Sequence, residues 1–309
     1  MDKNAKIYVA GHRGLVGSAL IRRLTQCGYS NLITRTHAEL DLLDQKAVHQ
    51  FMHNEKPDYT FLAAAKVGGI HANNELRADF IYMNMVIETN VVHAAYETGV
   101  GGLMFLGSSC IYPRECPQPM KEEHLLTGPL EQTNEPYAIA KIAGIKLCES
   151  FNRQYGTKYI SVMPTNLYGP NDNFDLQSSH VLPALMRKIH EAKLNDDATV
   201  PVWGTGNPMR EFLHVDDMAD GCVFLMEKGI ADGIYNIGTG TDVTIREAAE
   251  TIKDVVGFKG EFSFDTKMPD GTLRKLLDVS RMTELGWKAN YSLKDGLQQT
   301  YQWYMENIT

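Results

Sequence analysis

The sequence lacks the features of several protein classes. No apolar stretch approaches the roughly 20 residues of a membrane span, and no basic run is followed by an apolar one, as in a secretion signal. The 309 residues carry a net charge of −8, which argues against nucleic acid as the main partner. The five cysteines form no C-x-x-C pair, so neither zinc nor a disulfide framework is indicated. We therefore expect a globular cytoplasmic protein with free thiols, no metal, and no membrane or nucleic-acid partner.

Three glycines at regular spacing follow the first predicted strand. The strand at residues 7–10 runs directly into Gly11, Gly14 and Gly17, and a helix follows. Strand, glycine turn and helix are the context of a dinucleotide loop, in which the glycines allow a tight turn, a close pyrophosphate and helix packing. The alternative is a plain strand-to-helix turn. The loop residues expected to contact the cofactor are Gly11, His12, Arg13, Gly14, Leu15, Val16 and Gly17.

The second predicted strand, at residues 31–34, indicates which dinucleotide binds. A site for NAD usually places an acid at the end of this strand, but here Arg35 follows and Arg13 lies in the glycine loop. Cations at these positions suit a 2′-phosphate, so the sequence predicts NADP, with NADPH as the hydride donor. The alternative is that both arginines are solvated surface charges. Asp41 and Leu42 are expected near the adenine.

The order of elements predicts the fold class. Strands and helices alternate over the first 170 residues, which implies an α/β Rossmann-type, doubly wound parallel sheet. After about residue 170 the pattern becomes irregular. We therefore expect an NADP-binding domain at residues 1–170, completed by segments near 212–240, and a smaller α/β substrate domain formed mainly by residues 171–309.

The carboxyl ends of parallel strands are where such sheets bind ligands. Predicted strands at residues 103–106 and 159–163 end in small or polar residues. The residues at these strand ends expected to contact the cofactor are Leu106, Gly107, Ser109, Pro164, Thr165, Asn166 and Leu167. Two residues outside the strand ends, Lys141 and His180, are expected to contact it as well.

A tyrosine and a lysine have the spacing of a catalytic pair. Tyr137 and Lys141 are four positions apart in a helical pattern, so they share one helix face. A phenol with a pKa of about 10 is a poor acid at neutral pH, and we expect the neighbouring ammonium to lower that pKa. The tyrosine could then protonate a carbonyl oxygen as hydride reaches the carbon. Ser108, at a strand end, would hydrogen-bond the same oxygen, although a turn cap is the alternative for it.

These motifs resemble a known family. Gly11-x-x-Gly14-x-x-Gly17, Ser108 and Tyr137-x-x-x-Lys141 resemble the extended short-chain dehydrogenases/reductases over nearly the whole chain. Longer runs, at residues 10–14, 63–70, 107–113, 134–141 and 208–217, resemble the GDP-L-fucose synthases within that family. The resemblance implies a homodimeric epimerase-reductase. Such an enzyme converts GDP-4-keto-6-deoxy-D-mannose to GDP-L-fucose by 3,5-epimerisation and by NADPH-dependent reduction of the 4-ketone.

The resemblance also implies roles for single residues. Cys110 and His180 match the pair that moves protons during epimerisation; a buried hydrophobe and a helix cap are the alternatives. The positions that match GDP-sugar contacts in the family are Lys188, Trp203, Arg210 and Asp270. The alternatives are a solvated surface charge for Lys188, core packing for Trp203 and an ordinary turn residue for Asp270.

One departure from the family weakens the prediction that NADP is the cofactor. His37 stands where the family often has an arginine for the 2′-phosphate, so some use of NADH is plausible. Other functions remain open: a nucleotide-sugar 4-epimerase or 4-reductase of the same fold, or a non-catalytic NADP sensor.

Overall fold

A six-stranded sheet lies at the centre of the computed structural model, which describes residues 1–267 and 270–308. All neighbouring strands run parallel, in the order β10-β5-β4-β3-β1-β2. The strands are β1 (Ile7–Ala10), β2 (Leu32–Ile33), β3 (Tyr59–Leu62), β4 (Gly102–Leu106), β5 (Tyr159–Pro164) and β10 (Ile234–Ile237). Every residue of β1, β4 and β5 is buried, because a parallel sheet is covered on both faces.

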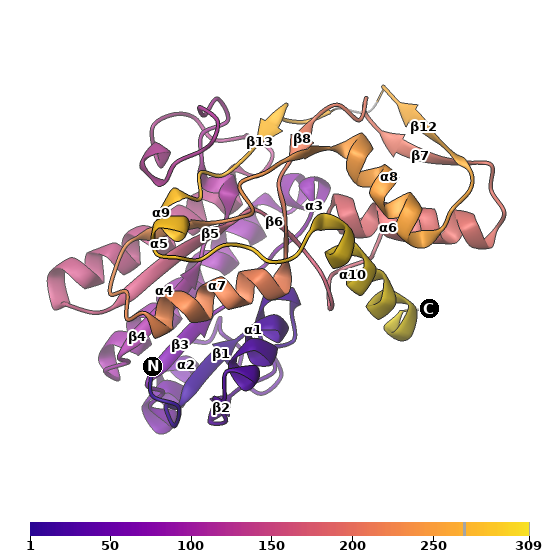
Figure 1. The fold of residues 1–309 in the computed structure, drawn as a ribbon. Helices are drawn as coiled ribbons and strands as arrows, with labels where there is room; N and C mark the ends of the chain where they lie inside the picture. Colours follow the sequence, from indigo (N-terminus) through magenta and orange to yellow (C-terminus); the bar gives the residue numbers. More distant parts are fainter. Residues whose placement is uncertain (268–269, 309) are drawn as a thin grey trace.

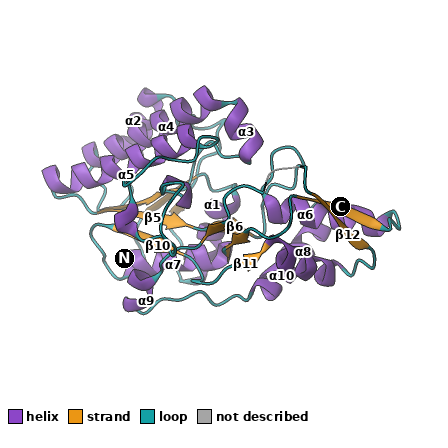
Figure 2. Cartoon of the chain, turned by 90° about the horizontal axis from the view of Figure 1, so that it is seen from above, coloured by secondary structure: helices purple, strands orange, loops and turns teal. Residues whose placement is uncertain are grey.

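Helices cover both faces of this sheet (Figure 2). On one face lie α2 (Gln45–Glu55), α4 (Arg77–Glu97) and α5 (Glu135–Tyr155), which share a single apolar core with the sheet. On the other face lie α1 (Leu15–Gln26), α7 (Val215–Glu227) and α9 (Ser280–Glu284), which share a second core. The chain leaves β1 toward β2 on one side and returns to β3 on the other, so the strand order reverses at β1. That reversal is where open α/β sheets bind ligands.

A smaller unit lies beside the carboxyl edge of the sheet (Figure 1). Its helices are α6 (Val181–Leu194), α8 (Ile245–Val256) and α10 (Leu293–Asn307), and they enclose a third apolar core. Its strands are β7 (Thr199–Trp203) with β12 (Glu261–Asp265), and β11 (Val243–Thr244), β8 (Met209–Arg210) and β13 (Arg274–Lys275). A further pair, β6 (Asn166–Tyr168) with β9 (Phe212–His214), joins the two units.

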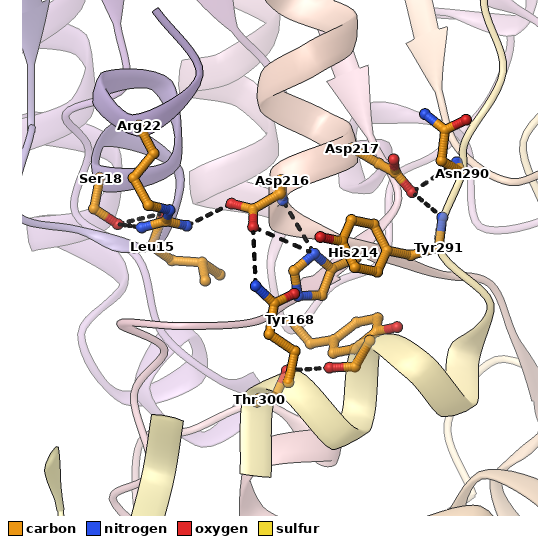
Figure 3. A network of polar contacts seen from close by, with 12 residues as sticks. Leu15, Ser18, Arg22, Tyr168, His214, Asp216, Asp217, Asn290, Tyr291 and Thr300 are labelled. Atoms are coloured by element: carbon orange, nitrogen blue, oxygen red, sulfur yellow. Dashed lines mark hydrogen bonds and ion pairs between the residues drawn. The ribbon is translucent and has the colours of Figure 1, made fainter. Parts of the chain in front are cut away.

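Polar contacts also tie the units together (Figure 3). Within the larger unit, the Arg22 guanidinium of α1 lies 2.5 Å from the Asp216 carboxylate at the start of α7, and the Gln299 side chain of α10 donates a hydrogen bond to the same carboxylate at 3.5 Å. Asp217 accepts hydrogen bonds from the backbone N–H groups of Asn290 and Tyr291, at 3.0 and 2.9 Å, just before α10. The contacts of Asp217 hold the segment before the C-terminal helix against α7 of the larger unit.

The predicted fold class is confirmed. The predictions missed α3 (Ile70–Glu75), and they did not resolve residues 209–214 into two short strands. Strands of two or three residues are too short to show a period, and their positions depend on partners distant in sequence. Within the described residues, no helix is both long and apolar enough to cross a membrane.

Candidate active site

The glycine loop is built from close backbone contacts. Gly11 has φ of +80°, and a Cβ there would lie 2.8 Å from the amide nitrogen of Ala64. A Cβ at Gly17 would overlap the Gly11 carbonyl group. Gly14 is the N-cap of α1 and provides no side-chain cap, so the first N–H groups of the helix are free to bind an anion. The loop therefore fits a dinucleotide pyrophosphate.

The cations predicted for the 2′-phosphate differ in availability. Arg13 is exposed, and the described part of the chain offers it no ion-pair partner. The Arg35 guanidinium lies 2.7 Å from the Glu55 carboxylate and 5.2 Å from the centre of the Phe51 ring. The His37 side chain is 81% exposed, with its Nδ1 atom 3.7 Å from Asp41 Oδ1. Arg13 is therefore the most available cation, whereas Arg35 is already paired.

Other predicted cofactor contacts surround the carboxyl edge. Leu42 packs against the core beneath α2, and its carbonyl accepts a hydrogen bond from Asn90 at 2.9 Å. The side chains of Thr165 and Asn166 both donate to the Glu211 carbonyl, at 3.1 and 2.9 Å. They bind this part of the sheet to the smaller unit, and only their remaining surfaces are free for a ligand.

Tyr137, Ser108 and Cys110 lie together at the end of β4. Ser108 Oγ accepts a hydrogen bond from the Cys110 N–H at 3.2 Å, and it also hydrogen-bonds the Tyr137 hydroxyl. Burial raises the pKa of Tyr137, the charges of Cys110 and Glu88 raise it further, and the Ser108 hydrogen bond opposes the shift. The expectation that Lys141 lowers this pKa is therefore wrong for this structure. Tyr137 is a protonated phenol at neutral pH.

Burial is the main reason that the pKa of Tyr137 is raised, and the partner of Lys141 adds to the effect. Its ammonium is 2.9 Å from the Glu88 carboxylate, and both side chains are only 2% exposed. Lys141 Nζ lies 5.9 Å from the centre of the Tyr137 ring. The negative charge of Glu88 offsets that of the ammonium, so the pair as a whole has little tendency to stabilise a phenolate.

His180 occupies the N-cap position of α6, but its side chain makes no capping hydrogen bond, so the structure gives it no helix-cap role. The preceding loop contacts the carboxyl edge of the sheet, since the Gly69 N–H donates to the Ser178 carbonyl at 3.0 Å. The imidazole remains accessible to solvent, but the surrounding atoms exclude enough water to lower the pKa of His180. A neutral imidazole can accept a proton at neutral pH.

The predicted GDP-sugar contacts lie in the smaller unit. Trp203 is 62% exposed, which is contrary to the core-packing alternative, and Lys188 Nζ lies 5.1 Å from its ring centre. Burial lowers the pKa of Arg210, and the charge of Cys110 acts on the same guanidinium. The Asp270 carboxylate accepts hydrogen bonds from the Thr205 N–H and hydroxyl, at 2.7 and 2.9 Å. Asp270 thus holds a turn, and its neighbour Pro269 lies outside the described residues.

Sequence reasoning missed Glu88, whose signal was an acidic residue inside a long, mainly apolar helix. It also missed Glu211, a buried carboxylate that accepts hydrogen bonds from the backbone N–H groups of Gly240 and Leu277, at 2.8 and 2.9 Å.

One cluster away from this site has the side chains of a metal site. His49, His93 and Glu97 offer ligand atoms within 4.8 Å of one another. His49 Nδ1 already lies 2.6 Å from the Glu97 carboxylate. We assign the cluster to the packing of α2 on α4.

Comparison with known proteins identifies the family whose sequences this chain resembles. A sequence model of the NAD dependent epimerase/dehydratase family matches residues 7–238. GDP-L-fucose synthase 1 of Arabidopsis thaliana is 61% identical over 99% of this chain and 95% of its own length. GDP-L-fucose synthase of Escherichia coli (strain K12) is 58% identical over 98% of this chain and 97% of its own.

Solved structures of similar proteins have the same fold as this chain. The GDP-mannoheptose C4 reductase of Campylobacter jejuni, with NADP bound, superposes with a TM-score of 0.90 at 42% identity and covers 99% of both chains. The family predicted from the glycine, tyrosine and lysine motifs is confirmed, and this chain belongs to the NAD dependent epimerase/dehydratase family.

Proposed function

We propose that this protein converts GDP-4-keto-6-deoxy-D-mannose to GDP-L-fucose, by epimerisation at carbons 3 and 5 followed by NADPH-dependent reduction of the 4-ketone. The observation that carries the proposal is the grouping of Ser108, Cys110 and Tyr137 at one strand end. GDP-L-fucose synthases of plant and bacterial origin match almost the entire chain at 58–61% identity, which supports this substrate over other nucleotide sugars.

The ketone makes both reactions feasible in one site. It acidifies the protons on carbons 3 and 5, so a base can remove each one and leave an enolate. Cys110 and His180 are the proposed proton carriers: one removes a proton from one face of the carbon, and the other delivers a proton of its own to the opposite face. Hydrogen bonds from Ser108 and Tyr137 would stabilise the enolate oxygen.

The reduction uses the same oxygen contacts. NADPH, when bound, supplies the hydride that adds to carbon 4. Tyr137 donates its phenol proton to the ketone oxygen as the C–O double bond becomes a single bond. The raised pKa of Tyr137 suits this role, because the residue must be protonated before the step.

We further propose that the smaller unit holds the GDP end of the substrate. Trp203 offers an exposed aromatic face for the base, and Lys188 and Arg210 offer cations for the diphosphate. The first 170 residues and the segments near 212–240 would form the cofactor domain.

The enzyme is also proposed to act in the cytoplasm as a homodimer. All five cysteines are free thiols, as expected in a reducing compartment. Large apolar side chains are exposed on the adjacent helices α4 and α5, namely Tyr82 and Met85 on the first and Ile139 and Tyr155 on the second. A two-fold contact through these helices would bury them.

The test is product identification by NMR after incubation with GDP-4-keto-6-deoxy-D-mannose and either NADPH or NADH. We expect GDP-L-fucose, formed faster with NADPH. A reduced product with unchanged configuration at carbons 3 and 5 would instead identify a 4-reductase, and absence of NADPH oxidation would remove the reductase function.

The Cys110→Ser variant tests the epimerase step separately. Deuterium uptake from solvent into the sugar should slow by about 10²-fold or more, since a hydroxyl is a far weaker base than a thiolate. Cys27→Ser, which alters a thiol at the end of α1, is the control. Uptake at the wild-type rate in the Cys110 variant would exclude Cys110 as a proton carrier.

A further inference from the structure

Glu88 is a carboxylate enclosed between two helices and the sheet. It lies on α4, is 1% exposed as a whole residue, and its side chain contacts Lys141 of α5 at 2.9 Å. Taking a lone carboxylate or ammonium out of water costs several kcal/mol. Each charge is therefore tolerated in this position only because the other is present.

A glycine in α5 leaves space for the Glu88 carboxylate but lowers the stability of that helix. Gly144 lies three residues after Lys141 within α5, where glycine disfavours helix by about 1 kcal/mol relative to alanine. A Cβ at this position would lie 2.8 Å from Glu88 Oε2 and would overlap the Phe105 ring. Any larger residue would push Glu88 away from Lys141, so the glycine permits the ion pair.

The Glu88 carboxylate has a single polar neighbour in the described part of the chain. Among the residues that the structure describes, the Lys141 ammonium is the only polar partner of its two oxygens. Lys141 Nζ in turn lies 4.8 Å from the centre of the Phe105 ring on β4. Carboxylate and ring together hold the ammonium from two sides, close to Tyr137.

We propose that Glu88 is a positioning residue for the reduction step, which fixes the Lys141 ammonium beside Tyr137 through their buried ion pair. The inference rests on the proposed function, in which Tyr137 protonates the ketone oxygen. According to this proposal, Glu88 affects the reduction step only through its contact with Lys141. The charge of Glu88 also favours the protonated phenol, which is the form that donates the proton.

The test is a double-mutant cycle of Glu88→Gln, Lys141→Met and the double variant, with kcat and KM measured for NADPH and for the sugar nucleotide. We expect Glu88→Gln to lower kcat by roughly 10- to 100-fold, as loss of a group that orients an active-site residue does elsewhere. The KM of the sugar nucleotide should change by less than about two-fold, because Glu88 is not placed at the substrate. In the double variant, kcat should be no lower than in Lys141→Met alone, because without the ammonium Glu88 has nothing to position.

Stability provides an independent measurement. Each single variant leaves one buried charge unpaired and should lower the melting temperature, whereas the double variant should melt above both. Glu122→Gln is the control for a buried carboxylate: Glu122 accepts a hydrogen bond from the Asn236 N–H at 2.9 Å, and its loss should lower stability without lowering kcat.

Two results would overturn the inference: a kcat for Glu88→Gln within about two-fold of wild type, or kcat losses that multiply in the double variant. Failure of the proposed function is recognised separately, because the wild-type protein would then not oxidise NADPH with this substrate. In that case the same cycle, measured as NADPH affinity by fluorescence, decides the inference: an additive effect of the two substitutions rejects it and a non-additive effect supports it.

Discussion

The proposed cofactor side and the proposed sugar-nucleotide side of this site are built in different ways. At the glycine loop, recognition depends on backbone atoms, and added Cβ atoms at Gly11 and Gly17 would clash with the main chain. At the smaller unit, the proposed recognition of the sugar nucleotide would depend on side chains such as Trp203, which is 62% exposed. The comparison teaches that substitutions at Gly11 and Gly17 act through folding as well as binding, whereas a substitution at Trp203 acts through binding alone.

The largest effect is expected at Tyr137, where the two sides meet. Tyr137→Phe removes the proposed acid, and kcat for NADPH oxidation should fall by about 10²- to 10⁴-fold. The melting temperature should stay close to wild type, because only the hydroxyl is lost. Turnover near the wild-type level would show that another group protonates the ketone.

Protonation of His214, which lies at the junction between the two units, should make the folded protein less stable in acid. The His214 side chain is 0% exposed, and burial lowers its pKa from 6.5 to about 4. Between these values the unfolded chain binds a proton that the folded protein does not, so stability is full above pH 6.5 and decreases toward pH 4. The loss from this group approaches about 3 kcal/mol.

Urea unfolding at several pH values measures this effect. The His214→Gln variant should lose stability less steeply between neutral and acidic pH than the wild type does. His37→Gln, at an exposed position, should leave the wild-type slope unchanged. An equal slope in all three proteins would mean that His214 is not the sensitive group.

Two glycines of the same loop can separate folding from binding. Gly17→Ala should lower the free energy of unfolding by about 1–3 kcal/mol through overpacking. Gly14→Ala should leave stability unchanged, because its Cβ would lie 3.5 Å from the nearest atom, but it should weaken NADPH binding. Unfolding curves and NADPH titrations of both variants measure the two effects separately. Equal stability of the two variants would contradict the close contact described for Gly17.

The smallest effect is expected at Trp203. Trp203→Ala should raise the KM of the sugar nucleotide by about 2- to 10-fold, the value of one aromatic stacking contact. Stability should be unchanged because the ring is mostly exposed. A large loss of stability would assign Trp203 to packing and would remove the contrast between the two sides.

Prediction from the sequence succeeded where the signal was local. The strand predicted before Gly11 lies at Ile7–Ala10, and Tyr137 and Lys141 share helix α5, which begins at Glu135 with Pro136 in its first turn. It failed where the partner is distant. Lys141 is visible beside Tyr137 in the sequence, but Glu88, 53 positions earlier by subtraction of the residue numbers, is not. The predicted direction of the Tyr137 pKa was wrong mainly because folding buries the phenol, and also because it brings the Glu88 charge close.

The order of strands and helices, the glycine loop and the Tyr137–Lys141 spacing were determined by the sequence alone, because each depends on residues a few positions apart. Tertiary structure alone decided which charges meet. It paired Arg35 with Glu55 and Lys141 with Glu88, and it left Arg13 and Trp203 open. Charge and burial depend on distances in space, and folding brings together residues that the sequence separates.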